Sequence, residues 1–200
     1  MNKISTPSCT VIAIFLALST ISGNAYATGN TYKNSYYKYE KIKEFIPEGY
    51  EIYDTASGDF NGDGFRDYII VLRSSIENAN SNGNRPLLVL TGAAKGKFEL
   101  LARNDNVVLC ETCGGPFGDP YSKLSINGPV LSIEHSVGGT YQWSRVITFK
   151  YNTTTKGLLL NDDITKTFQK FGPNNQRSIA SNKKDFGTLP FSSYSYSKGF

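Results

Sequence analysis

Residues 58–67 read GDFNGDGFRD, a stretch in which side chains that carry oxygen alternate with other residues. Alternate residues of a tight loop can point their oxygens toward one centre, and this spacing matches the template of a calcium-binding loop. The sixth position of that template is Gly64, and a glycine there permits the chain to reverse. The predicted ligands at positions one, three, five, seven and nine are Asp59, Asn61, Asp63, the carbonyl of Phe65, and Asp67.

The loop holds three carboxylates that repel one another unless a cation neutralises them, so we expect a divalent ion. Calcium accepts oxygens at loose geometry, whereas magnesium demands a stricter octahedron. An EF-hand needs a glutamate at position twelve, but that position is Ile70, inside the strand-like run YIIVL. We therefore predict Ca²⁺ in a loop that joins two strands. A polar turn without metal is the alternative, because Asn-Gly and Asp-Gly pairs also favour hairpins.

The elements that must position this loop are strands. From residue 50 onward, short runs rich in β-branched and aromatic residues are separated by clusters of Gly, Asn, Pro and Asp. The connections are too short for crossover helices, which favours antiparallel pairing. We predict a mainly β fold, an antiparallel meander of about seven to nine strands, sandwich-like or partial propeller-like, with a short N-terminal helix. The runs are YEIYD, YIIVLRS, LLVLTG, KFELLAR, VVLC, VLSIEHSV, YQWSRVITFKY and GLLLN.

One hairpin can be predicted in register. A three-residue loop over residues 138–140 would pair residue 137 with 141, 135 with 143 and 131 with 147, which places every apolar residue on one side. His135, the only histidine, then faces Trp143 on the buried side. It is either a catalytic base or a packed core histidine. The sequence places no nucleophile beside it, which favours the packed histidine.

The two ends of the chain differ from the middle. Residues 1–27 carry Lys3, a short apolar run and an Ala-Tyr-Ala boundary, which predicts a signal peptide. We assign residues 28–48 to a Tyr-rich segment with a short helix that ends before Pro47. Residues 49–170 form the predicted β domain, with a helical turn in DDITKTFQKF. Residues 171–200 form a loop and strand extension, with one closing strand at TLPFSSY.

Export sets the compartment and the redox state. A signal peptide predicts a periplasmic or secreted protein, and an oxidising compartment favours a disulfide between Cys110 and Cys113. Turn residues follow this pair, which argues against a thiol-exchange enzyme and for a structural clip. Residues 28–200 carry a net charge of only +3, which argues against nucleic-acid binding. No run is long enough for a membrane span.

The stretch GDFNGDGFRDYIIV resembles the cation loop of FG-GAP and VCBS-type repeats, the strand–loop–strand units of integrin-like propellers. The resemblance implies ligands at Asp59, Asn61, Asp63 and Asp67. A single copy is present, so a closed propeller is not expected. Residues 44–190 as a whole resemble a family of small exported bacterial proteins. Besides the loop, the segments that carry this resemblance are FIPEGYEIYD, RPLLVL, ARNDNVVLCETCGGPFGDPY and the hairpin with Gly-Gly and Trp. That resemblance implies export and a β-rich fold but no particular activity.

Three functions remain open from the sequence. We expect a non-catalytic calcium-binding protein, in which the ion is structural and supports binding to another exported protein. The first alternative is a periplasmic immunity or inhibitor protein. The second is a hydrolase of cell-wall or sugar polymers that uses a carboxylate pair, for which the candidates are Glu111, Asp119 and Glu134. The oligomeric state is not predicted.

Overall fold

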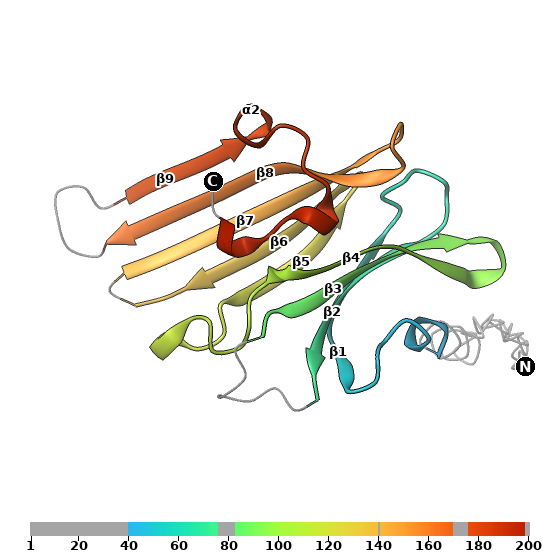
Figure 1. The fold of residues 1–200 in the computed structure, drawn as a ribbon, viewed down its shortest axis with the longest axis horizontal. Coiled ribbons are helices and arrows are strands. Elements are labelled where there is room, and N and C mark those ends of the chain that lie inside the picture. The colour runs from blue at the N-terminus through green and yellow to red at the C-terminus, as the bar shows by residue number, and fades with distance from the viewer. Residues whose placement is uncertain (1–39, 76–82, 140, 170–175, 199–200) are drawn as a thin grey trace, which may run out of the picture.

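The fold is mainly β, as predicted, and is built from two antiparallel sheets (Figure 1). The computed structural model describes residues 40–75, 83–139, 141–169 and 176–198. The predicted signal peptide and residues 28–39 lie outside the described residues. Within the described ranges there are nine strands, and within each sheet the strands that follow one another in the chain are paired.

The first sheet, called sheet A, contains β1 (Tyr50–Gly58), β2 (Asp67–Ser74), β3 (Arg85–Ala93) and β4 (Lys97–Val108). The second, sheet B, contains β5 (Tyr121–Asn127), β6 (Val130–Val137), β7 (Tyr141–Asn152), β8 (Gly157–Gln169) and β9 (Gln176–Asn182). The remaining elements are short: η1 (Ala94–Gly96), η2 (Gly115–Phe117), α2 (Lys183–Phe186), η3 (Phe191–Ser193) and η4 (Tyr196–Lys198).

The central strands of sheet A, β2 and β3, are buried on both faces, which explains their continuous apolar runs. Ile69 and Val71 join a core cluster that includes residues of sheet B. Ile70 and Leu72, which alternate with them, belong to a second cluster on the opposite face. That second cluster packs against Ile42, Phe45 and Ile46 of the segment that precedes β1. The sheets therefore pack as a sandwich, and the N-terminal segment adds a further layer.

Of the predicted N-terminal helix, the structure describes residues 40–43, which form a helical turn. Its residue Ile42 is 5% exposed and packs on sheet A. The chain leaves this turn before Pro47, as the sequence predicted, and reverses at Gly49, whose φ is 80°. This short segment covers an apolar face that would otherwise meet water.

The hairpin of β6 and β7 has the predicted faces but a different register. Val137 pairs with Trp143, His135 with Arg145 and Leu131 with Phe149, so the predicted pairs are wrong by two residues. A shift of two leaves the parity of each strand unchanged, so the same side chains remain on the buried face. The last pair of this ladder is Val137 with Trp143, so residues 138–142 separate the paired ends where the prediction had residues 138–140, and this length sets the register of a hairpin.

The C-terminal third departs further from the prediction. The stretch predicted as a helical turn, DDITKTFQKF, continues β8 as far as Gln169. It pairs with β7 on one side and β9 on the other, and these two ladders outweigh a weak local preference for helix. The predicted closing strand at TLPFSSY is also wrong: only Pro190 forms a bridge, with Leu159, and the strand that closes sheet B is β9.

The segment around η3 and η4 is part of the core rather than a surface extension (Figure 1). Phe191 and Tyr194 are each 1% exposed, and both rings pack edge-on against Phe149 of β7. The side-chain amide of Asn104 in β4 donates hydrogen bonds to the carbonyls of Phe191 and Tyr194. This segment therefore fills the space between β4 and sheet B.

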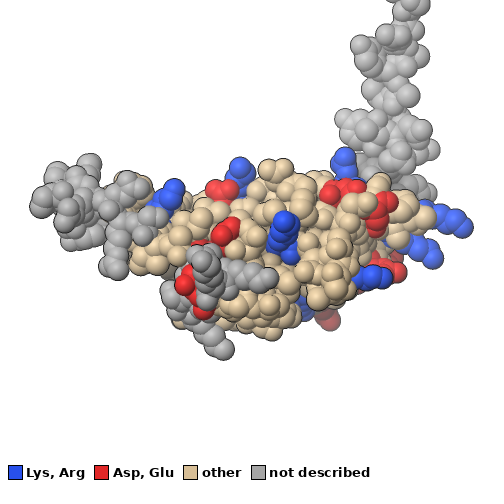
Figure 2. All heavy atoms as spheres, turned by 90° about the horizontal axis from the view of Figure 1, so that it is seen from above, with Lys and Arg blue, Asp and Glu red and all other residues tan. Residues whose placement is uncertain are grey.

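Charged side chains are dispersed over the face seen in Figure 2. On the face shown in Figure 2, basic and acidic residues are interspersed and neither sign forms a broad patch. In the part of the chain that the structure describes, no helix has both the length and the apolar character to cross a membrane.

Replacing Phe191 with alanine tests whether the C-terminal segment belongs to the core. We expect Phe191→Ala to lower the free energy of unfolding by about 3–5 kcal/mol, because it leaves a cavity against Phe149. The measurement is denaturant unfolding followed by circular dichroism. Phe168→Ala on β8, where the ring is 37% exposed, is the control and should cost much less. Equal losses in the two variants would contradict the packing described here.

Candidate metal loop and the polar networks between the sheets

The candidate metal loop connects the paired ends of β1 and β2, as predicted. Gly58 and Asp67 are the last pair of this ladder, and residues 59–66 lie between them. Gly62 and Gly64 have φ values of 78° and 84°, in the left-handed region that glycine adopts without strain. These two glycines allow the chain to curl into a compact turn.

Hydrogen bonds draw three of the predicted ligands together. Oδ1 of Asp59 accepts from the N–H groups of Gly62 and Asp63, at 2.7 and 3.2 Å, and Oδ2 accepts from Gly64 at 2.9 Å. The N–H of Asp63 also donates to Oδ1 of Asn61 at 3.0 Å. Oxygens of Asp59 and Asn61 therefore converge on one backbone nitrogen. The Asn61 amide nitrogen is 2.8 Å from Oδ2 of Asp63, which places the third side chain beside them.

Asp67 lies deeper than the other predicted ligands. Its side chain is fully buried, Oδ2 accepts from the N–H of Phe60 at 3.0 Å, and Oδ1 accepts from the N–H of Gly92 at 2.9 Å. Burial raises the pKa of Asp67, and the negative charge of Asp63 adds to this effect. The backbone N–H groups that donate hydrogen bonds to this carboxylate lower its pKa and so partly oppose the rise. The negative charge of the loop therefore affects the pKa of Asp67, and the two hydrogen bonds of Asp67 hold the loop against β3.

The approach of β3 to the loop requires a glycine. A Cβ atom added to Gly92 would lie 2.3 Å from the carbonyl oxygen of Arg66, closer than real atoms allow. Gly92 therefore permits the loop and β3 to meet, and its N–H group supplies the hydrogen bond to Asp67. The sequence alone gave no reason to link this glycine to the loop.

The loop offers oxygens of several kinds to a cation. Asp59 and Asp63 are exposed side chains, Asn61 is half-buried, and Phe65 is 42% exposed. Within the described ranges, no three His, Cys, Asp or Glu side chains are grouped so that they could hold a metal ion. A cation here would therefore depend on the Asn61 amide oxygen and the Phe65 carbonyl as well as on carboxylates. Such mixed oxygen sets suit calcium.

The two cysteines of CETC form a disulfide, as predicted. Cys110 is buried and Cys113 is exposed, and the N–H of Cys113 donates to the carbonyl of Cys110 in a tight turn. The residues directly after the pair form the short η2 turn, which leads into β5. The pair therefore closes a turn between the last strand of sheet A and the first strand of sheet B.

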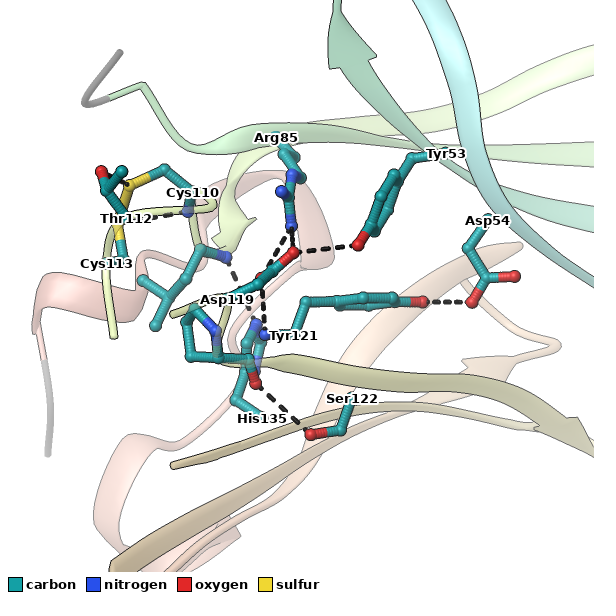
Figure 3. Close-up of polar contacts among 12 residues, drawn as sticks. Tyr53, Asp54, Arg85, Cys110, Thr112, Cys113, Asp119, Tyr121, Ser122 and His135 are labelled. Carbon is teal, nitrogen blue, oxygen red and sulfur yellow. Dashed lines mark hydrogen bonds and ion pairs between the residues drawn. A yellow bond between two sulfur atoms is a disulfide. The ribbon is translucent and has the colours of Figure 1, made fainter. Parts of the chain in front are cut away.

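An unpredicted polar network connects the two sheets next to this turn (Figure 3). Arg85 of β3 is 2% exposed, and its Nη1 lies 3.0 and 2.8 Å from the two carboxylate oxygens of Asp119. Asp119 also accepts from the hydroxyl of Tyr53 and from the N–H of Tyr121. The Tyr121 hydroxyl donates to Asp54 at 2.6 Å. Residues of β1, β3 and β5 are joined by this set, called the Arg85–Asp119 network.

A second network lies within sheet B and reaches the C-terminal segment. Arg145 of β7 and Asp163 of β8 form a two-pronged ion pair at 2.7 and 2.6 Å. The hydroxyl of Tyr194 donates to Asp163, and the guanidinium of Arg145 donates to the carbonyl of Tyr196. Burial and the charge of Asp163 raise the pKa of Tyr194, which keeps the hydroxyl protonated as a donor.

His135 lies between the two networks as a packed side chain. It is 1% exposed, its Nε2 accepts from the N–H of Leu109 at 3.3 Å, and its ring contacts those of Tyr121 and Tyr196. Among the described residues, its Nδ1 has no hydrogen-bond partner. Burial lowers the pKa of His135 to about 4, and the positive charge of Arg145 contributes. The histidine is therefore neutral near pH 7.

The three carboxylates considered for hydrolysis lie in different surroundings. Asp119 is bound by Arg85, and Glu111 lies in the exposed turn between the cysteines. Glu134 precedes His135 in β6, and adjacent residues of a strand point to opposite faces. Glu134 therefore lies on the face of sheet B away from the core, whereas Asp119 belongs to the network between the sheets.

Comparisons with known proteins do not extend these observations. No family model, curated protein or solved structure matches the chain. The geometry of the loop and of its surroundings is therefore the basis for any functional assignment.

The depressed pKa of His135 predicts a pH dependence of stability. Between about pH 6.5 and 4 the unfolded chain binds a proton at this histidine and the folded protein does not, so folding stability falls as the pH falls through this window. We expect His135 to account for a loss of about 2–3 kcal/mol. Urea unfolding at intervals from pH 7 to pH 4 measures it.

His135→Gln is the control, because its side-chain oxygen can still accept from Leu109 but does not titrate. The chain has no other histidine, so the variant removes every histidine titration. The loss of stability attributed to His135 should vanish. Identical pH profiles for the variant and the wild-type protein would show that His135 is not held neutral by the fold.

Proposed function

We propose that the protein is an exported, non-catalytic calcium-binding protein in which the ion stabilises the junction of β1 and β2. The observation that carries this proposal is the convergence of Asp59 and Asn61 oxygens on the N–H of Asp63, in an exposed loop. The residues that would hold the ion are Asp59, Asn61, Asp63, the carbonyl of Phe65, and Asp67. The resemblance to FG-GAP-type loops supports the same ligand set.

The donor set fits calcium on chemical grounds. An ionised carboxylate has about four lone-pair positions, so the two backbone hydrogen bonds to Asp67 leave it able to accept a cation. Burial is the main cause of the raised pKa of Asp67, and the negative charge of nearby Asp63 adds to it. A bound divalent ion would supply the opposite charge and would favour the ionised form of Asp67.

The proposed role of the ion is a brace. The loop connects β1 and β2, and Asp67 already links it to β3, so an ion held there would restrain three strands at once. Export rests on the signal peptide predicted over residues 1–27 and on the disulfide between Cys110 and Cys113. We further propose that the braced end of the sheet presents a surface to another exported protein.

Calcium should raise the thermal stability of the wild-type protein. Extracellular calcium modules bind with dissociation constants of about 0.1–1 mM, so about 10 mM calcium should add roughly 1.4–2.7 kcal/mol to the free energy of unfolding. The measurement is thermal unfolding of the metal-free protein with increasing calcium, together with isothermal titration calorimetry. Magnesium at the same concentration should have a smaller effect, because the site is irregular.

Asp63→Ala should abolish the calcium effect, since it removes an exposed carboxylate of the loop. Asp105→Ala is the matched control. Asp105 is an exposed carboxylate of β4 that pairs with Arg103, and it lies toward the opposite end of this strand from Lys97, which is near the loop. It should leave the calcium response unchanged. The proposal fails if the wild-type protein shows no response, or if Asp63→Ala responds as the wild type does.

A further inference from the structure

A half-open pocket with a volume of about 240 Å³ lies beside the candidate metal loop. Its walls come from the end of the loop, from β2 and β3, and from the turn into β4. The side chains that give it chemical character are three cations and three aromatic rings: Arg66, Lys95, Lys97, Phe65, Tyr68 and Phe98. No acidic residue is among those that line it.

The three cations are available to a ligand. Arg66, Lys95 and Lys97 are exposed, and none of their charged groups forms an ion pair or hydrogen bond with the described residues. Some other surface cations among the described residues are paired, as Arg73 is with Glu51 and Arg103 with Asp105. Three unpaired positive groups around one concave site favour a negatively charged ligand.

The aromatic walls add a second requirement. Tyr68 and Phe98 contact each other edge to face, with ring centroids 5.4 Å apart, and Phe65 is 42% exposed at the rim. Tyr68 and Phe98 are half-buried, and ring surface that lines a pocket packs well against a flat apolar body. An apolar cavity of about 150 Å³ is sufficient for benzene, so this pocket has room for one ring with a substituent.

We infer that this pocket binds a small anionic ligand, or the end of a larger one, in which a carboxylate or phosphate is attached to a ring-sized body. The ring would pack against Tyr68 and Phe98, and the anionic group would meet Arg66, Lys95 and Lys97. Gly92 lies in the wall and is fixed to the loop through Asp67, so the pocket has a defined shape. The inference does not depend on calcium, because these cations and rings belong to the chain.

The test is a titration of the metal-free, ¹⁵N-labelled protein with benzoate, followed by the amide resonances of Gly92, Gly96 and Phe98. Calcium is removed with a chelating resin, so that no soluble chelator competes. Phenyl phosphate should shift the same resonances. Benzyl alcohol, which has the ring without the charge, should bind more weakly, and benzylammonium should not bind.

Lys95→Gly is a suitable variant, because Lys95 has a φ of 62°, which glycine adopts without strain. It should weaken benzoate binding by about three- to tenfold through loss of a charged contact. Lys156→Gly is the matched control: Lys156 is exposed, has a φ of 49°, and lies in the turn between β7 and β8. It should leave benzoate binding unchanged. Lys97→Gln provides a second variant that should also weaken binding.

Three results would overturn the inference. One is the absence of shifts at the pocket up to about 10 mM benzoate, well above the millimolar range of a weak site. Another is equal binding of benzylammonium and benzoate, or equal affinity in Lys95→Gly and Lys156→Gly. The third is benzoate binding that requires calcium, which would place the anion on a metal ion in the loop. Binding in metal-free protein would stand even if calcium has no effect on stability.

Discussion

The buried carboxylate of Asp67 is the constraint on which the candidate site depends. It accepts hydrogen bonds from the loop at Phe60 and from β3 at Gly92, and it begins β2 itself. A buried carboxylate is costly unless its oxygens are hydrogen-bonded, and these two N–H groups meet that need. The position of the loop, the path of β3 and the wall of the neighbouring pocket therefore all follow from one side chain.

The two polar networks orient the rest of the molecule around this sheet. Apolar packing between sheets is not directional, so it does not by itself fix how one sheet sits on the other. The Arg85–Asp119 network joins β3 to the start of β5, and the ion pair of Arg145 with Asp163 fixes the C-terminal segment through Tyr194. Breaking a buried ion pair leaves an uncompensated charge, so both networks disfavour alternative packings.

Much of the fold could be predicted from local patterns. Continuous apolar runs such as YIIVL and LLVL are typical of strands buried on both faces, and two clusters lie on opposite sides of sheet A. The strand–loop–strand setting of GDFNGDGFRD and the pairing of Cys110 with Cys113 were also predicted correctly. These features depend on residues close together in the chain, where spacing and residue type carry the information.

The features that were missed depend on residues far apart in the chain. Arg85 and Asp119 are 34 positions apart, and no local pattern connects them. One signal was available in β7. Arg145 lies two residues before Ile147 and four before Phe149, so the predicted alternation of faces already placed this cation on the buried side of the strand. A buried arginine needs an acidic partner, which Asp163 provides. The strand β9 gave no comparable signal, since its pairing with β8 is a tertiary choice.

The hydrogen bonds of the loop bear on what a calcium ion would contribute. Asp59 accepts from three backbone N–H groups, whose partial positive charges offset its negative charge and hold the curled shape without an ion. An ion would bind oxygens that are already gathered, so little conformational entropy would be lost on binding. Calcium in this loop would therefore act on one end of sheet A, with a modest gain in stability and a stiffer wall for the neighbouring pocket.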